Sequence, residues 1–364
     1  MKRITLLIAV VIMVTACSSE NFHAVDEVVN HAIEERIFPG AVLLVGNSEG
    51  ILYEKAYGKF TYDEASREVT TESMFDLASL TKVFATSMSV MKCIDSGLVD
   101  PEAKVVHYLP EFDNHGKDII KVKHLLLHIS GMPSYATPAD SPEGTLDRIM
   151  NIEMTQELGE YKYSCLNFIT LMRVVEAASG KKMWEFYKEE YTEPMGLERT
   201  MFAPPPSLWE ECLPTIGDSS GTRIILQGIV HDPLARSLEG YSGNAGLFTT
   251  ASELAAFCQL MMNKGVYSGR RYVKEETIRP FMTRQAGNRT YGWSVKTPRN
   301  SAGDKMSATA IGHTGYTGTS AWIDMENDVF ILLLTNRVYP LDQKAVNPVR
   351  RKVNNAVMRA LSGM

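Results

Sequence analysis

The 364-residue chain lacks the sequence features that mark metal-binding, disulfide-rich, repeat and nucleic-acid-binding proteins. None of its five cysteines has metal-like spacing, and four of them are too scattered to form a disulfide framework in a domain this large: Cys93, Cys165, Cys212 and Cys258. The sequence has no internal repeat, no low-complexity segment and no long basic run, and its formal net charge is −6. This charge pattern argues against nucleic acid as the main partner.

The apolar run at the start of the chain, residues 4–14, is too short to span a bilayer. It follows a charged start and precedes small residues, which is the layout of a secretory signal. Residues 14–17, Val-Thr-Ala-Cys, resemble a bacterial lipoprotein signal, in which cleavage before the cysteine leaves Cys17 to carry lipid. The alternatives are an ordinary signal peptide that is cleaved nearby and a short membrane anchor.

These observations divide the chain. We expect residues 1–16 to be a lipoprotein signal peptide, residues 17–23 a tether and residues 24–364 a folded domain. The mature protein would then belong to the cell envelope, anchored by lipid to a bacterial membrane and facing the periplasm or the exterior. At 45% hydrophobic residues, the folded part can bury a sizeable core.

The most informative motif is Ser79-Leu80-Thr81-Lys82, at the start of an apolar helical stretch. A lysine three residues after a serine lies one helical turn away on the same face, where it can share a hydrogen bond with the hydroxyl. Free backbone N–H groups at a helix start also favour developing negative charge. The alternative is an N-cap serine followed by a solvated lysine.

Two further segments sharpen this interpretation. Residues 163–165 (Tyr-Ser-Cys) open a helical run, and residues 312–318 (Gly-His-Thr-Gly-Tyr-Thr-Gly) lie between strand-like stretches. A Ser-x-x-Lys, a central Tyr-x-x and a late His/Lys-Thr-Gly, in that order, resemble the superfamily of serine β-lactamases and penicillin-recognising D-alanyl-D-alanine peptidases. The resemblance runs from about residue 25 to the end. Four segments look like the class C-related serine hydrolases: residues 75–82, 122–133, 243–250 and 313–337.

The order of the elements predicts an α+β fold. Hydrophobic periodicity predicts a helix over 24–36, a hairpin over 41–57 and a closing helix over 348–361, together with late strands over 291–295, 308–313, 319–325 and 329–335. We therefore expect an antiparallel sheet from residues 24–78 and 285–364, flanked by terminal helices, with a mostly helical insertion over 79–284. The resemblance implies the β-lactamase/transpeptidase fold.

Ser79 is the candidate nucleophile, and Lys82 would receive or relay its proton. Burial destabilises an ammonium, so we expect the pKa of Lys82 to fall, which would make it a usable base. Tyr163 is the second candidate base, since positive charge on Lys82 could stabilise its phenolate. The sequence leaves open how the two divide the proton transfer.

His313 occupies the place that lysine holds in most β-lactamases of this superfamily. We expect its imidazole to offer a weaker, pH-dependent positive charge to a substrate carboxylate. Thr314 and Gly315 would form a strand edge along which a peptide-like substrate lies. The resemblance also implies an oxyanion hole made by the backbone N–H groups of Ser79 and Tyr316.

Cys165 departs from the family pattern, which usually has asparagine or aspartate there to bond the lysine and the substrate amide. A thiol is a poor donor and acceptor, so Cys165 would bind substrate weakly. Asn167 lies nearby in the sequence. His124 and His128 form an i, i+4 pair, but they match a structural segment of the family, and we expect neither a metal nor an organic cofactor.

The sequence therefore predicts a secreted, lipid-anchored serine hydrolase that forms an acyl-enzyme on Ser79. Resemblance favours peptide or amide bonds of cell-wall fragments, as for a D,D-carboxypeptidase or a muropeptide amidase. A small-ester hydrolase and a weak β-lactamase are alternatives within the enzyme class. From another class, an inactive wall-binding lipoprotein would keep the fold with a site weakened at Cys165.

Overall fold

A computed structural model describes residues 21–219, 221–342 and 345–363. The predicted signal peptide, Cys17 and most of the predicted tether lie outside the described residues. Within the described residues, no helix combines the length and the apolar character needed to cross a bilayer.

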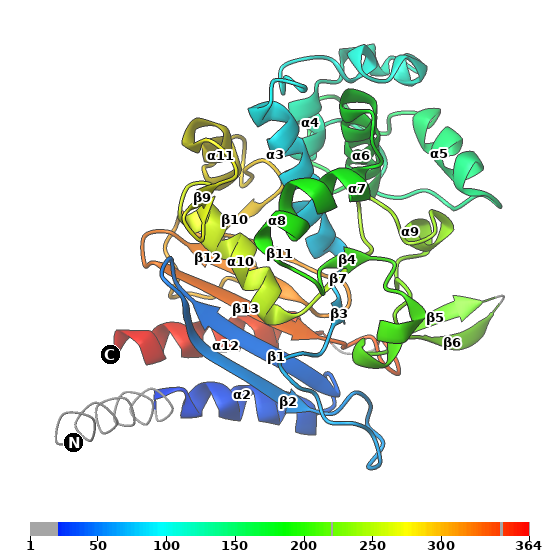
Figure 1. The fold of residues 1–364 in the computed structure, drawn as a ribbon. Helices are drawn as coiled ribbons and strands as arrows, with labels where there is room; N and C mark the ends of the chain where they lie inside the picture. The colour runs from blue at the N-terminus through cyan, green and yellow to red at the C-terminus, as the bar shows by residue number, and fades with distance from the viewer. Residues whose placement is uncertain (1–20, 220, 343–344, 364) are drawn as a thin grey trace.

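The centre of the fold is a six-stranded antiparallel sheet that joins both ends of the chain (Figure 1). Its order is β10-β11-β12-β13-β1-β2, so strands from the C-terminal part continue directly into the N-terminal hairpin. Ala41 of β1 pairs with Thr335 of β13, and the register holds to Gly46 and Phe330. The strands are β1 (Gly40–Gly46), β2 (Ile51–Gly58), β10 (Ser294–Val295), β11 (Ile311–Thr314), β12 (Ser320–Asp324) and β13 (Val329–Thr335).

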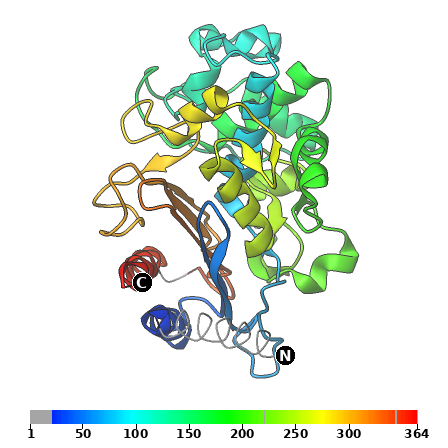
Figure 2. The same cartoon turned by 60° about the vertical axis from the view of Figure 1, so that its left-hand side comes forward.

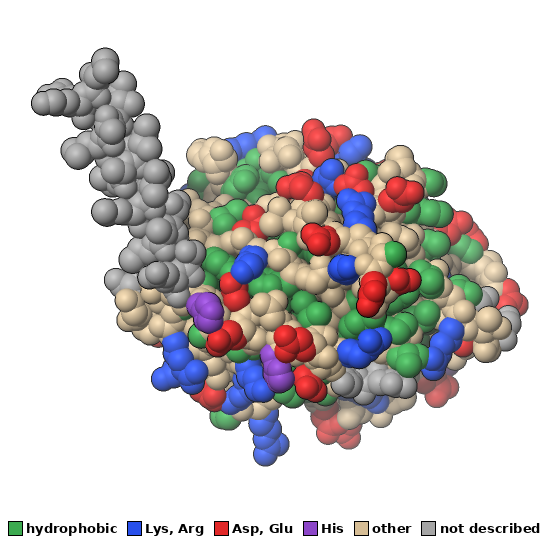
Figure 3. All heavy atoms as spheres, turned by 90° about the horizontal axis from the view of Figure 1, so that it is seen from below, with side chains coloured by type: hydrophobic (Ala, Val, Ile, Leu, Met, Phe, Trp, Pro, Cys, Tyr) green, Lys and Arg blue, Asp and Glu red, His purple; other side chains and the backbone are tan. Residues whose placement is uncertain are grey.

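Two terminal helices cover one face of this sheet (Figure 2). They are α2 (His23–Glu34) and α12 (Asn347–Ser362), which also pack against each other. Alternate side chains of β1 point to opposite faces, so Leu43 packs with the terminal helices while Leu44 joins the larger core on the other side. Seen from below in Figure 3, acidic and basic side chains intermingle on the outer surface.

The other face carries the helical region, whose helix α10 packs against β1 and β13. Its α-helices are α3 (Ser87–Asp95), α4 (Val122–Leu126), α5 (Pro142–Met150), α6 (Cys165–Ser179), α7 (Met183–Tyr187), α8 (Glu193–Met195), α9 (Pro233–Ser237), α10 (Ala251–Met262) and α11 (Glu275–Met282). Short strands lie beside them: β3 (Phe75–Asp76), β4 (Met201–Phe202), β5 (Thr215–Ser219), β6 (Thr222–Leu226), β7 (Leu247–Thr249), β8 (Val266–Tyr267) and β9 (Arg270–Arg271). Strands β3, β7 and β4 form a small sheet that leads to Ser79.

The α+β class and the terminal origin of the main sheet are confirmed. The predicted strand over 291–295 is shorter, since only Ser294–Val295 pairs. The reason lies at Gly292, which has a φ of +90° and donates its N–H to the Leu126 carbonyl at 3.0 Å. That bond ties the segment to α4 instead of the sheet. Sequence reasoning also missed the β5–β6 hairpin, which follows Pro214.

Candidate active site

A tight turn between β3 and the following helix presents Ser79. Ala78 has a φ of +46°, a strained conformation for a residue with a Cβ. The buried Asp76 carboxylate holds this turn by accepting the Ala78 N–H at 2.8 Å and the His231 N–H at 2.7 Å. Because it is buried, the pKa of Asp76 is raised to about 6, although both N–H donors lower it. Sequence reasoning missed this support.

Lys82 reaches Ser79 from the next turn. The helical stretch that the sequence predicts from Ser79 begins as a 3-10 turn (Ala78–Leu80), continues as a π turn (Lys82–Thr86) and becomes α3. This winding leaves Lys82 fully buried with its Nζ 3.0 Å from the Ser79 Oγ. Nζ also donates to the Asn244 carbonyl at 2.8 Å, and the Cys165 Sγ lies 3.5 Å away.

Tyr163 comes from the segment before α6 and is partly buried. The Lys82 Nζ lies 5.2 Å from the centre of its ring. His128 anchors both neighbours of Tyr163, because its carbonyl accepts the Lys162 N–H at 2.8 Å and its Nδ1 accepts the Ser164 N–H at 3.1 Å. The imidazole of His128 thus fixes the backbone beside Tyr163 through a hydrogen bond.

The expected fall in the pKa of Lys82 is wrong. Burial lowers that pKa, but the thiol of Cys165 and the phenol of Tyr163 face the ammonium and favour its charged form, which holds the pKa of Lys82 above its usual value. Burial raises the pKa of Tyr163, and the attraction of Lys82 only partly offsets it. At neutral pH the site therefore holds an ammonium on Lys82 and a neutral phenol on Tyr163.

His313 lies on β11, almost buried beside the ring of Tyr163 at a centroid distance of 5.9 Å. Its Nδ1 donates to the Thr314 carbonyl at 3.1 Å. Burial, followed by the positive charges of Arg289 and Lys82, holds the pKa of His313 well below its usual value. The imidazole is therefore neutral at physiological pH, and the expected positive charge at this position is wrong.

The turn after β11 is bonded to the segment that presents Ser79. Thr317 donates its hydroxyl to the Asp76 carbonyl at 2.7 Å, and Thr319 donates to the Leu77 carbonyl at 3.0 Å. A Cβ on Gly315 would lie 2.5 Å from the Leu77 carbonyl oxygen, so only glycine allows this approach. As a result Ser79, Thr314, Gly315 and Tyr316 line one pocket.

Cys165, which stands where the family usually has asparagine or aspartate, contacts Lys82 in the structure. Its thiol stands at the start of α6, facing Lys82. Asn167 is buried and accepts a hydrogen bond from Ser130 at 2.6 Å, so it is engaged away from the lysine. The Asn244 carbonyl, from the glycine-rich loop before β7, is the closest hydrogen-bond partner of the Lys82 Nζ.

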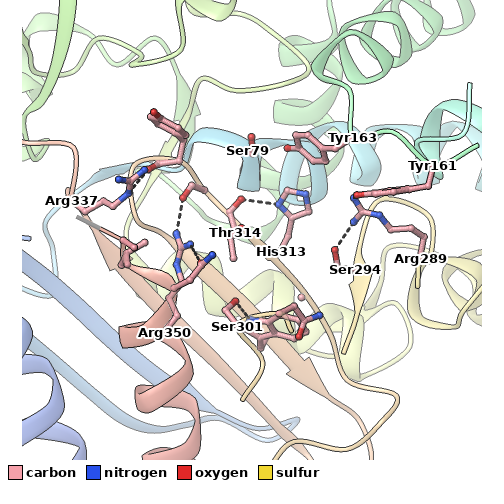
Figure 4. Close-up of a pocket in the computed structure, with 18 residues that line it drawn as sticks. Ser79, Tyr161, Tyr163, Arg289, Ser294, Ser301, His313, Thr314, Arg337 and Arg350 are labelled. Atoms are coloured by element: carbon pink, nitrogen blue, oxygen red, sulfur yellow. Dashed lines mark hydrogen bonds between the residues drawn. The ribbon is translucent and has the colours of Figure 1, made fainter. Parts of the chain in front are cut away.

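The pocket has a volume of about 530 Å³ and is rich in arginine. Figure 4 shows Ser79, Tyr163 and His313 close together, with Arg289 beside Tyr161 on one side of them and Arg337 and Arg350 on the other. The described residues that line it include no aspartate or glutamate. Sequence reasoning singled out none of the three arginines: Arg337 ends the family-like segment 313–337, while Arg289 and Arg350 lie outside all four such segments.

His124 and His128, for which the sequence predicts a structural role, both accept hydrogen bonds from backbone N–H groups. The His124 Nδ1 accepts the Lys121 N–H at 3.1 Å at the start of α4, while the Nδ1 of His128 is taken by Ser164. Among the described residues, no group of three or more histidine, cysteine, aspartate or glutamate side chains could hold a metal ion.

The chain is similar in sequence to one protein family and to two bacterial enzymes of that kind. The family model described as Beta-lactamase matches residues 25–355. An N-acetylmuramyl-L-alanine amidase of Bacillus subtilis (strain 168) is 31% identical over 373 aligned positions, which cover 91% of this chain and 84% of the amidase. A protein of Escherichia coli (strain K12), provisionally assigned as a D-alanyl-D-alanine carboxypeptidase, is 30% identical, with 85% of this chain and 81% of that protein covered.

Solved structures share the fold at lower identity. A penicillin-binding protein homologue from Caulobacter crescentus superposes with a TM-score of 0.77 at 18% identity, covering 93% of this chain and 97% of the homologue. A family VIII carboxylesterase superposes with a TM-score of 0.76, also at 18% identity and with the same two coverages. At this identity the likeness concerns the fold.

Proposed function

Because the chain belongs to the β-lactamase family of serine hydrolases, we propose that it cleaves peptide or amide bonds in cell-wall fragments through an acyl-enzyme on Ser79. The single observation that carries the proposal is the 3.0 Å contact between the Ser79 Oγ and the buried Lys82 Nζ. The names of the Bacillus subtilis amidase and the Escherichia coli relative support a substrate from the cell wall.

The proposed reaction begins with the Lys82–Tyr163 pair in its deprotonated form. The pair accepts the Ser79 proton while Oγ attacks the substrate carbonyl carbon, and the carbonyl oxygen becomes an oxyanion. Backbone N–H groups of Ser79 and Tyr316 would stabilise that oxyanion, and one such donor is worth on the order of 3 kcal/mol. The same pair then protonates the leaving amine, and water releases the acyl group.

Digestion of purified muropeptides tests the reaction type. The soluble form, residues 19–364, is incubated with peptidoglycan fragments, and the products are identified by mass spectrometry beside those of Ser79→Ala. We expect either loss of a terminal amino acid or separation of the stem peptide from the sugar, and neither with Ser79→Ala. Identical, uncleaved muropeptides with both proteins would contradict the proposal.

The proposal includes export and a lipid anchor at Cys17, supported by the pattern of residues 1–17. Full-length protein expressed in a bacterial host should sediment with membranes, and its processed form should gain the mass of a lipid. Cys17→Ser should remove the added mass and release processed protein from the membrane fraction. An unmodified mass on the wild-type membrane-bound protein would refute the lipid anchor.

A small-ester hydrolase is the second candidate. The observation that favours it is the neutral state of His313, because an ester substrate needs no cation at that position. The fold shared with a carboxylesterase is compatible with it. Turnover of short acyl esters with no cleavage of any muropeptide would favour this function over the first.

A further inference from the structure

A second region of the molecule, apart from the cleft, is lined by aromatic side chains. Two cavities lie where helix α7 and strand β4 meet the loop before β7 (Figure 1). Both have Trp184, Phe202 and Tyr241 in their walls, so they adjoin and form one groove, which we call the aromatic groove. Their volumes of about 530 and 550 Å³ are typical of small-molecule sites. Among the described residues, none lines both this groove and the pocket of Ser79.

The three shared rings form a row and not a cage. The ring centres of Trp184 and Tyr241 lie 5.1 Å apart, with an angle of 36° between the ring planes. Those of Tyr241 and Phe202 lie 6.5 Å apart at 34°. Rings this close leave no room for a cationic head group between them. Trp184 and Tyr241 are half-buried, so the row presents a surface on which a flat apolar face can stack.

The wall of the groove also carries a hydroxyl group without a partner. Tyr187 of α7 lines one of the two cavities and is only 1% exposed. Its Oη has no hydrogen-bond partner within residues 21–219, 221–342 and 345–363. A buried hydroxyl without a partner is unfavourable, and phenylalanine would fill the same space without it. The hydroxyl at this wall therefore points to a ligand that supplies the missing hydrogen bond.

The charged residues around the groove are mostly acidic. The two cavities are lined by two lysines and by five glutamates: Glu143, Glu176, Glu193, Glu198 and Glu239. One of the lysines, Lys188, is paired with Glu193 at 3.2 Å. This balance disfavours an anionic ligand, such as a phosphate or a fatty acid. Carboxylate oxygens accept hydrogen bonds from hydroxyl groups, so the rim suits a neutral ligand that is rich in hydroxyls.

We propose that the aromatic groove binds a neutral sugar chain built from N-acetylated amino sugars. The C–H groups on one face of a pyranose ring form a flat apolar surface, which stacks on Trp184 or Tyr241 while the ring hydroxyls face the carboxylates. The acetamide carbonyl of an N-acetyl group accepts the hydrogen bond that Tyr187 does not make elsewhere among the described residues. The inference rests on the proposed function only for the source of the sugar, which is the bacterial cell wall.

The consequence is a second point of attachment for a polymeric substrate. A sugar strand held in the aromatic groove keeps the peptides attached to it near the cleft, which raises their effective concentration at Ser79. The groove adds no group to the reaction, because its lining residues are separate from those of the cleft. It thus contributes to substrate recognition and leaves the chemistry to Ser79 and Lys82.

Calorimetric titration with the tetramer of N-acetylglucosamine, a neutral and soluble probe, tests the groove in a Ser79→Ala background. We expect saturable binding of one tetramer per chain. Adding Trp184→Ala should raise the Kd at least tenfold, because it removes the accessible end of the row of rings. Adding Tyr187→Phe should raise the Kd at least threefold. Its Tm should stay unchanged or increase, because the variant loses only a hydroxyl without a partner.

Trp209→Ala is the matched control, because Trp209 is an exposed tryptophan that lines neither cavity of the groove. It should leave the Kd unchanged. Circular dichroism and thermal unfolding establish that each variant folds, and Trp184→Phe provides a milder change should Trp184→Ala unfold. It should raise the Kd about threefold. An unchanged Kd in folded Trp184→Ala or Tyr187→Phe would overturn the inference. Saturable binding of choline chloride without binding of the tetramer would also overturn it, by assigning the groove to a cation.

The Ser79→Ala background separates this inference from the proposed function, because it reports recognition without turnover. Binding of the tetramer that is weakened by Trp184→Ala would support the groove even if the wild-type enzyme cleaved no muropeptide. Absence of tetramer binding by folded Ser79→Ala protein would reject the groove even if the wild-type enzyme cleaved muropeptides.

Discussion

The cleft and the aromatic groove offer a ligand different kinds of contact. Around Ser79, the ammonium of Lys82 is held by the Asn244 carbonyl and faces the thiol of Cys165 and the ring of Tyr163. The aromatic groove has a row of rings and an acidic rim. The cleft can store and return a proton, while the groove offers a flat apolar surface. The comparison assigns chemistry to the cleft and sugar recognition to the groove.

Removing the ammonium from the cleft should have the largest effect. Lys82→Met keeps the apolar stem and removes the contact with the Ser79 Oγ, so we expect kcat/KM to fall by a factor on the order of 10³ or more. Binding of the sugar tetramer in the aromatic groove should stay at its wild-type strength. A variant that keeps more than a tenth of wild-type activity would show that Lys82 is not part of the base.

The pH dependence of the rate tests the protonation states in the cleft. The pKa values of Lys82 and Tyr163 are both raised, so the deprotonated form of the pair is scarce at neutral pH and grows with pH. We expect kcat/KM for a muropeptide to rise by up to tenfold per pH unit between about pH 6 and 9. A rate that is flat or falls over this range would contradict the assigned states.

The Cys165→Asn substitution tests whether the thiol lowers the catalytic efficiency of the site. An amide can accept from the Lys82 ammonium and bind a substrate amide, and a good hydrogen bond contributes about 1 kcal/mol. We expect kcat/KM to increase about fivefold. Cys165→Ala is the control and should leave kcat/KM within twofold. A large loss in both variants would show that the thiol has an essential part in the reaction.

The smallest effect is expected at His313, and it sharpens the assignment of charge within the cleft. His313 is neutral, so His313→Gln removes no charge from the pocket. The rise of kcat/KM with pH should therefore keep its wild-type slope between about pH 6 and 9, whatever happens to kcat. Loss of that slope in the variant would show that His313, and not the Lys82–Tyr163 pair, titrates over this range.

The sequence predicted the main sheet well because its pattern is local. Strands β1 and β13 show unbroken apolar runs that are buried on both faces, and the turn residues 47–50 separate β1 from β2. The spacing of Ser79 and Lys82 follows in the same way from helical geometry. Tyr163 and His313 could be placed in the cleft only through resemblance, since they are far apart along the chain.

The rest of the site depends on contacts that no local pattern carries. Arg289 lines the pocket from a segment that the Gly292 N–H ties to the Leu126 carbonyl of α4. The sign of the pKa shift of Lys82 depends on which groups face it, and burial alone gives the wrong sign. The carbonyl that holds Lys82 belongs to Asn244, a backbone group without a sequence signal.

The most direct test of the central claim is intact-protein mass spectrometry after exposure to a fluorophosphonate. Soluble wild type, residues 19–364, should gain the mass of one adduct, and labelling should accelerate as the pH rises. Ser79→Ala should gain none, and Lys82→Met should react far more slowly. Folded wild-type protein without an adduct, or an adduct that persists in Ser79→Ala, would contradict an activated nucleophile at Ser79.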